Sequence, residues 1–309
     1  MVAVLKNYLL VSKPGVVFGN LIAAAGGFLL AAKGHLDLGL ILPALVGITL
    51  VVASACVFNN CIDRNLDRKM IRTCNRPLAR RTISLPGAVC YGTLLGITGG
   101  ALLWTATNLL AFVIVLAGFV IYVGMYSFHL KRNSIYGALI GSLAGTAPPL
   151  AGYCAVNNRF DLGALILLSI FSLWQMPHCY AIALFSFDDY AAATIPVVPV
   201  TRGRAAAKKH IIGYILAYTV ATLMLSFCGY TGYGYLAVSA ILGLSWLWLA
   251  WVGFRTSNDR LWAKRLFVFS ILSILVLSVM MSIDFRVAPA DRLDPGQTAP
   301  AYSFRTIPK

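Results

Sequence analysis

The recurrence of long apolar blocks constrains the fold of this chain more than any other feature. A helix needs about 20 apolar residues to cross the hydrocarbon core of a bilayer. Nine blocks approach or exceed that length, over residues 14–32, 38–58, 85–105, 109–128, 135–154, 162–185, 211–228, 233–253 and 266–283. Only 11% of the residues are charged, whereas a soluble domain has about 25%. We therefore predict an all-α, polytopic membrane protein with nine transmembrane helices.

The chain is expected to form one membrane domain over residues 1–286. No short hydrophobic segment with a small-residue cleavage site opens the sequence, so the first span is expected to be the targeting signal. Residues 287–309 include the polar, proline-bearing run DRLDPGQTAP. Such a composition cannot bury a core, and it predicts a disordered C-terminal tail.

The distribution of basic residues between the spans predicts the orientation. With the N-terminus in the cytoplasm, 19 of the 25 Lys and Arg residues fall on the cytoplasmic side, as the positive-inside rule requires. Nine spans then place the C-terminus in the periplasm of a bacterial inner membrane. The same distribution accounts for the net charge of +15 without nucleic acid as a partner.

The segment NNCIDRNLDRKMIRTCNRPLARR, residues 59–81, follows the second span directly. Within it Asn59, Asp63 and Asp67 recur at four-residue steps, which places them on one helix face. An amide and two carboxylates suit a hard cation such as Mg²⁺, and the many arginines that follow suit phosphates. The simpler alternative is a helix end with solvated charges.

A second candidate site spans the sixth block and the loop after it. On a regular helix, His178 and Asp189 lie three turns apart on one face, with Phe185 between them and Gln175 one turn away. An ionisable residue within a span is a functional candidate. The alternatives are a hydrogen-bonded core histidine for His178 and a solvated loop pair for Asp188 and Asp189.

Two of the predicted spans have unusual residues, a polar side chain in the first and a run of small side chains in the fifth. Asn20 is a polar residue in the first span, and we expect it to face a central cavity. The small residues of GALIGSLAGTAPPLAG, residues 137–152, allow helices to approach closely, and we interpret this span as a packing element. The alternative is that it lines a functional cavity.

Five stretches resemble the UbiA superfamily of intramembrane prenyltransferases, in its branch that farnesylates haem. They are KPGVVFGNLIAAAGGF, VFNNCIDRNLDRKMIRTCNRPL, YSFHLKRNSIYGALIGSLAGTAPPLAGY, FSLWQMPHCYAIALF and DDYAAATIPVVPV. The resemblance implies helices around a central cavity, farnesyl diphosphate as donor, and haem B as acceptor and not as cofactor. It also implies Mg²⁺, with Mn²⁺ as a substitute, and a haem–copper oxidase or haem A synthase as a partner.

The resemblance also assigns roles to residues. Asn59, Asp63 and Asp67 match the metal-binding motif, and Asp188 or Asp189 stands where the family has a second aspartate-rich motif. Arg72, Arg76 and Lys131 match basic positions suited to diphosphate. The assigned catalytic set is Asp63, Asp67, Lys131 and Asp189, and the substrate-binding set is Asn20, Asn59, Arg72, Arg76, Tyr126, Gln175 and His178.

Tyr126 and Lys131 fall on the family's Tyr–Lys loop, but four residues separate them where many members have three. This departure puts the role of Tyr126 in question. Two other functions remain open, a prenyltransferase for another acceptor such as a quinone precursor, and a transporter. Paired acidic loops with clustered arginines favour the enzyme, because transporters more often hold charged pairs at mid-membrane.

Overall fold

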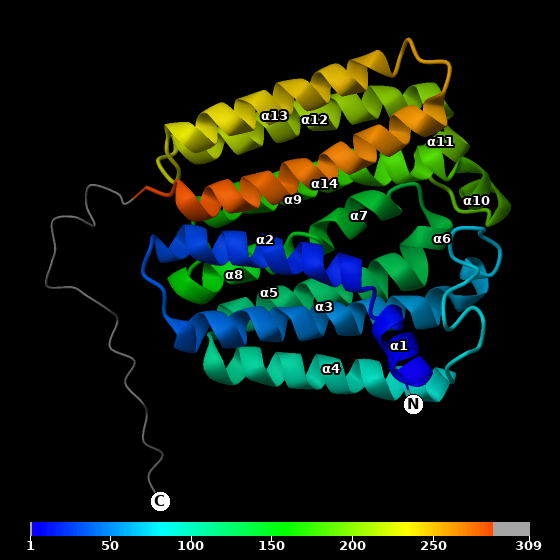
Figure 1. Cartoon of the computed structure of the whole chain (residues 1–309), viewed down its shortest axis with the longest axis horizontal. Helices are drawn as coiled ribbons and strands as arrows, with labels where there is room; N and C mark the ends of the chain where they lie inside the picture. The colour runs from blue at the N-terminus through cyan, green and yellow to red at the C-terminus, as the bar shows by residue number, and fades with distance from the viewer. Residues whose placement is uncertain (1, 287–309) are drawn as a thin grey trace, which may run out of the picture.

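The computed structural model describes residues 2–286, which are almost entirely helical (Figure 1). In chain order the helices are α1 (Val2–Val11), α2 (Pro14–Ala32), α3 (Leu38–Asp67), α4 (Leu85–Ala106), α5 (Leu109–Phe119), the π-helix η1 (Val120–Leu130), α6 (Lys131–Asn133), α7 (Gly137–Ala144), α8 (Ala147–Asn157), α9 (Leu162–Phe185), α10 (Phe187–Ala192), α11 (Val198–Thr201), α12 (Arg204–Phe227), α13 (Tyr233–Val252) and α14 (Asp259–Ile283). Over these residues the only β-pairing is an isolated bridge between Thr231 and Phe285. The predicted tail, residues 287–309, lies outside the described part of the chain.

The prediction of an all-α protein with nine spans is confirmed. Within residues 2–286, nine segments are long and apolar enough to cross a membrane, and they correspond in order to the nine predicted blocks. Several helices extend beyond the apolar block that predicts them. The largest extension is in α3, which continues to Asp67, so that the polar motif is the last two turns of a spanning helix.

Polar side chains fix where several of these helices begin. The Asp37 carboxylate accepts the Gly39 N–H at 2.8 Å at the start of α3. Ser84, Asn108 and Asp161 cap α4, α5 and α9 in the same way. These residues satisfy amide groups that have no partner inside the helix.

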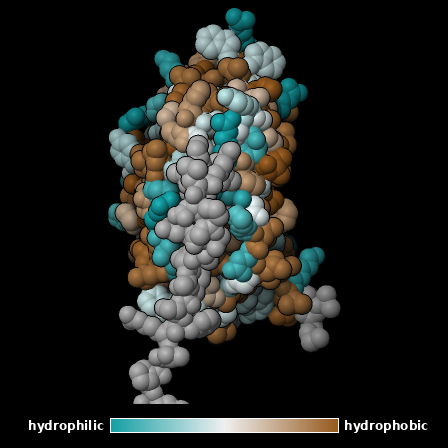
Figure 2. All heavy atoms as spheres, turned by 90° about the vertical axis from the view of Figure 1, so that its left-hand side faces the viewer, coloured by the Kyte–Doolittle hydropathy of each residue, from teal (hydrophilic) through white to brown (hydrophobic). Residues whose placement is uncertain are grey.

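The spanning helices lie side by side with their long axes roughly horizontal in Figure 1. The short helices α1, α6, α10 and α11 gather at the right-hand end of that view, where the loop between α3 and α4 also lies. Figure 2 looks at the opposite end and shows hydrophobic side chains along the flanks of the bundle. These short helices and the α3–α4 loop therefore share one end of the molecule.

Close backbone contacts set the spacing of the helices around the centre. A Cβ atom on Gly27 of α2 would lie 2.0 Å from the Pro149 oxygen of α8, and one on Gly152 of α8 would lie 2.2 Å from the Ala24 oxygen. Only glycine permits this approach of α2 to α8. The expectation that the small-residue span is a packing element is correct for α8.

Candidate active site

One face of the last two turns of α3 carries the polar motif. Asn59, Asp63 and Asp67 are all buried, with Asp63 fully removed from solvent. The Asn59 Nδ2 donates to Asp63 Oδ2 at 3.0 Å and to Ser127 Oγ of η1 at 2.8 Å. The motif therefore forms the floor of a site inside the protein and not a solvated helix end.

Cations from two other segments oppose the two carboxylates. Lys131 Nζ lies 2.5 Å from Asp63 Oδ2, and the Arg132 guanidinium lies 3.7 Å from Asp63 Oδ1. Arg76, in the loop after α3, donates to both oxygens of Asp67 at 2.9 and 3.0 Å. The structure thus brings together Asn59, Asp63 and Asp67, as the helical repeat predicts, with Arg76 and Lys131, which the family resemblance assigns to the site.

Lys13 is a residue of this site that the sequence analysis missed. It stands just before α2 with a left-handed backbone (φ 56°), and its Nζ donates to Asn59 Oδ1. Desolvation of its ammonium group lowers the pKa of Lys13 to about 8. The sequence could have drawn attention to Lys13 because a lysine followed by Pro14 stands directly before a span. Nothing in the sequence links this lysine to Asn59.

The π-helix η1 explains the unusual spacing of Tyr126 and Lys131. The Lys131 N–H donates to the Tyr126 carbonyl, which is an i to i−5 bond. A π-turn holds one more residue than an α-turn. The two residues therefore lie one turn apart despite the extra residue between them, and both line a space of about 130 Å³ beside the polar motif.

The second aspartate pair reaches the site by a route that differs from our expectation. The prediction of one regular helix from His178 to Asp189 is wrong, because α9 ends at Phe185 and α10 starts at Phe187. The break at Ser186 turns Asp189 away from the His178 face and toward the α3–α4 loop. There its carboxylate accepts the backbone N–H groups of Ile71 and Arg72 at 2.8 and 3.2 Å. Asp188 and the Arg72 side chain are exposed.

An apolar contact supports the junction between these two loops. Met70 packs in one buried cluster with Ala193 and Ile195. Together with the Asp189 hydrogen bonds, this contact ties the segment after α10 to the arginine-bearing loop after α3. Asp189 is therefore bound to the backbone of the loop that carries Arg72 and Arg76.

A cavity of about 300 Å³ lies deeper in the bundle, between α2, α3, α5, η1, α7, α8 and α9. Asn20, Tyr126, Gln175 and His178 all line it. Tyr126 and Cys179 also line the smaller space that contains Lys131, so the cavity continues toward the polar motif. The alternative expected for the small-residue span, a cavity lining, therefore holds beside its packing role, since Gly141, Gly145 and Ala147 line this cavity as well.

The side chain of Gln175 packs directly against Gly145. A Cβ atom on Gly145 would lie 1.7 Å from Gln175 Oε1. His178, one turn further along α9, stacks on Trp174 and contacts Phe267 of α14, with ring centroids at 4.8 and 4.7 Å. Its Nδ1 lies 2.7 Å from Ser270 Oγ. His178 is thus held by α14 while it faces the cavity.

The donor set of the polar motif fits a magnesium ion that shares its ligands with substrate. Within residues 2–286, no three His, Cys, Asp or Glu side chains cluster closely enough to hold a metal by themselves. Mg²⁺ commonly needs only one or two carboxylates, because waters and substrate phosphates complete its shell. Asp63 Oδ1 lies 3.7 Å from the Arg132 guanidinium but is buried without a hydrogen-bond partner, and an oxygen with that free capacity is suited to a hard cation.

Comparison with known proteins connects this geometry to a family. The profile of the UbiA prenyltransferase family matches residues 20–273. Protoheme IX farnesyltransferase of Edwardsiella ictaluri is 60% identical over 286 residues, which cover 93% of this chain and 97% of that protein. Protoheme IX farnesyltransferase 2 of Pseudomonas fluorescens Pf0-1 is 58% identical over 283 residues, covering 92% and 96%. A UbiA homolog from Archaeoglobus fulgidus, solved with GPP and Mg²⁺, superposes with a TM-score of 0.70 at 16% identity, covering 89% and 99%.

Proposed function

The chain belongs to the UbiA prenyltransferase family, and we propose that it transfers a farnesyl group from farnesyl diphosphate to a vinyl group of haem B, giving haem O. The relatives described above carry that activity in their names. The observation that carries the proposal is a single continuous site with two unlike ends. A polar, cation-ringed motif lies at one end and an apolar cavity with His178 lies at the other.

The polar end has the chemistry to bind and release a diphosphate. Lys13, Arg76, Lys131 and Arg132 converge on Asn59, Asp63 and Asp67 from three separate segments. A diphosphate brings its own negative charge, so these cations can hold it beside the buried carboxylates. Their positive charge stabilises the leaving group as the C1–O bond breaks.

Asn59, Asp63 and Asp67 would hold Mg²⁺, and Asp189 would support them by fixing the arginine loop. Mg²⁺, when bound, supplies charge neutralisation on the diphosphate oxygens. Mn²⁺ prefers similar oxygen ligands, and we propose that it can substitute.

The proposed reaction breaks the C1–O bond of the donor, forms one carbon–carbon bond to the acceptor and adds one water. Loss of diphosphate takes the C1–O electron pair and leaves an allylic cation. A haem vinyl group donates its π electrons to C1, and water then adds to the resulting cation with loss of one proton. The apolar side chains of Val51, Val52, Val115, Phe119 and Ile182 on the cavity wall limit premature capture of the allylic cation by water.

His178 and Gln175 are proposed to serve the haem acceptor. His178 places an imidazole deep in the cavity, held by Ser270 and two aromatic rings. Such a group can contact the iron or a propionate. Haem B is a substrate in this proposal, and Asn20 and Tyr126 line its path.

The membrane placement completes the proposal. We place the end with α1, α6, α10 and α11 in the cytoplasm of a bacterial inner membrane, because most Lys and Arg residues belong to that end. The product remains in the bilayer, so a haem–copper oxidase or a haem A synthase is the expected consumer.

The test is reconstitution of the purified chain in lipid nanodiscs with farnesyl diphosphate, haem B and Mg²⁺. We expect a product whose mass equals haem B plus a farnesyl group and a hydroxyl group, and we expect it to vanish with a chelator. Product with a quinone-precursor ring but none with haem would assign the acceptor to another class. Full activity in chelator would overturn the metal assignment.

A further inference from the structure

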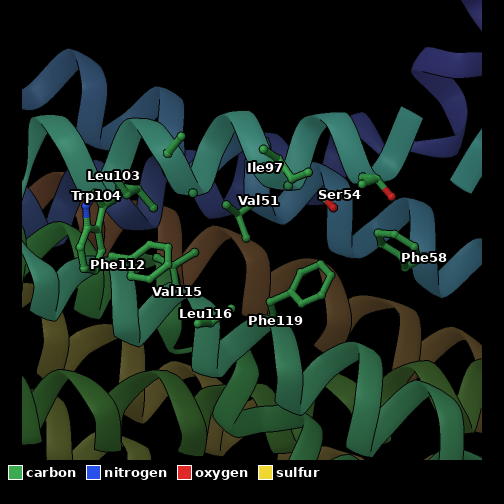
Figure 3. A pocket seen from close by; sticks show the side chains of 14 residues that line it. Val51, Ser54, Phe58, Ile97, Leu103, Trp104, Phe112, Val115, Leu116 and Phe119 are labelled. Atoms are coloured by element: carbon green, nitrogen blue, oxygen red, sulfur yellow. The ribbon is translucent and has the colours of Figure 1, made fainter. Parts of the chain in front are cut away.

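Grooves on the outer surface of the bundle differ in the charge of the residues that line them. The groove between α3, α4 and α5 has no charged residue in its lining (Figure 3). It is open to the outside, because the lining residues Ile97, Trp104 and Leu116 are 65%, 57% and 46% exposed. This groove offers an apolar surface to a hydrocarbon chain but no cation to a headgroup.

Two further grooves, of about 400 and 410 Å³, each combine two cations with apolar side chains. The α13–α14 groove is lined by Leu249, Lys264, Arg265, Val268, Phe269 and Leu272. The α12–α13 groove is lined by Lys209, Ile212, Trp251, Phe254 and Arg255. Leu249 and Trp251 face different sides of α13, since two residues turn a helix by about 200°. The two grooves therefore flank the end of α13 that leads to α14 (Figure 1).

Each groove has its cations at one end and apolar residues further along the helix. Arg265 lies in the second turn of α14, and Val268 and Leu272 follow it at steps of three and four residues, which places all three on one face. Lys209 likewise lies one turn before Ile212 on α12. Both helices begin at the end of the bundle that carries the short helices (Figure 1). The cations therefore lie nearer the membrane surface, and the apolar residues lie nearer its middle.

The cations of the two grooves can meet an anion from outside the protein. All four are exposed, and within residues 2–286 none of them pairs with a carboxylate. Residues 202–265 contain eight Lys and Arg residues but one carboxylate, that of Asp259. Lys208 and Arg204 already pair with it. The positive charge of the grooves therefore has no counterion in the described part of the chain.

An aromatic pair indicates that the α12–α13 groove lies at the level of the lipid headgroups. Trp251 is 61% exposed, and its ring centroid lies 6.2 Å from that of Phe254. Tryptophan is enriched where a membrane protein meets the boundary between hydrocarbon and water. The cations beside this pair are therefore placed where phosphate groups of lipids lie.

We propose that each of these two grooves binds an anionic phospholipid, with its phosphate at the two cations and an acyl chain along the apolar residues. Basic pockets between transmembrane helices on the cytoplasmic side suit anionic headgroups. A zwitterionic lipid carries a compensating amine and is attracted less, and a free phosphate lacks the chain. None of the lining residues borders the central cavity, so these sites are separate from the one proposed for prenyl transfer.

The experiment counts bound lipids by native mass spectrometry of the full chain in detergent. The probes are phosphatidylglycerol, phosphatidylcholine with the same acyl chains, and glycerol 3-phosphate as a headgroup without chains. We expect two phosphatidylglycerol molecules to bind at least about tenfold more tightly than phosphatidylcholine, the difference expected for two cations near a membrane surface.

Three double variants locate the bound lipids. Lys264→Gln with Arg265→Gln should remove one phosphatidylglycerol molecule, because it neutralises the α13–α14 groove. Lys209→Gln with Arg255→Gln should remove the other. The matched control is Lys69→Gln with Arg80→Gln, which neutralises two exposed cations of the α3–α4 loop and should remove neither.

Four results would overturn the inference. The first is unchanged phosphatidylglycerol binding in both groove variants, which would place the lipid elsewhere. The second is equal binding of the two lipids, since the grooves would then hold only bulk lipid. The third is displacement of phosphatidylglycerol by an equal concentration of glycerol 3-phosphate, because the apolar residues would then contribute nothing. If a double variant unfolds, the single variants Lys264→Gln and Lys209→Gln repeat the comparison, and unchanged binding in both is the fourth.

Discussion

At the level of single residues, Asp63 and Asp67 are both buried carboxylates, but their cations come from different parts of the chain. Asp63 pairs with Lys131, and Asp67 pairs with Arg76. We expect Asp63→Asn and Asp67→Asn each to lower turnover by about 10²–10³-fold, the effect typical of losing one electrostatic contact to a transition state. Haem O formation by purified variants measures this. Asp37→Asn, which preserves a helix cap far from the site, is the control. Near-normal turnover in either variant would contradict the metal assignment.

Asp188 and Asp189 are adjacent but differ in what they contact. Asp189 accepts two backbone N–H groups of the arginine loop, whereas Asp188 is exposed. Asp189→Asn should therefore reduce kcat/KM for farnesyl diphosphate by at least about tenfold, since it weakens a charge-assisted contact worth roughly 1.5–3 kcal/mol. Asp188→Asn serves as the matched control and should stay within about twofold. Equal losses would show that both carboxylates act directly at the site.

His178 offers a test of how the two ends of the site divide their work. His178→Ala should weaken haem B binding while farnesyl diphosphate binding stays unchanged, because His178 lies in the apolar cavity and away from the cation-ringed motif. Asp67→Ala should have the opposite pattern. Titration of each ligand into each variant measures both. If His178→Ala binds haem normally and only lowers the melting temperature, the residue is a core histidine held by Ser270.

At the level of secondary-structure elements, the π-helix η1 sets the relation of Tyr126 to Lys131. Deleting the exposed residue Phe128 would shorten this turn to an α-turn and leave the two side chains one turn apart. We expect the deletion to retain activity within about tenfold of the unmodified protein. Inserting one alanine after Phe128 should abolish it, since Lys131 would rotate by about 100° away from Asp63. Prenyl-transfer activity is compared in membranes that contain equal amounts of the deletion and insertion variants. Similar activity of both variants would contradict this account of η1.

At the level of the whole molecule, the orientation can be tested at two arginines. Arg80 is exposed in the α3–α4 loop, and Arg159 is exposed between α8 and α9 at the other end. We expect a membrane-impermeant maleimide to label Arg159→Cys in cells with a permeable outer membrane, and Arg80→Cys only after the inner membrane is opened. The unmodified protein gives the background from native cysteines. The reverse pattern would invert the topology.

The sequence by itself determined the number of spans, because burial of apolar blocks in lipid depends on composition alone. It also determined the shared face of Asn59, Asp63 and Asp67, because that follows from the helical repeat. Tertiary structure alone decided that Lys13 meets Asn59 and that Lys131 meets Asp63, over separations of 46 and 68 residues. It also decided the break at Ser186 that turns Asp189 toward Ile71, and the opening between α4 and α5. These features depend on which helices pack together and how closely their glycines let them approach, and no local repeat encodes that choice.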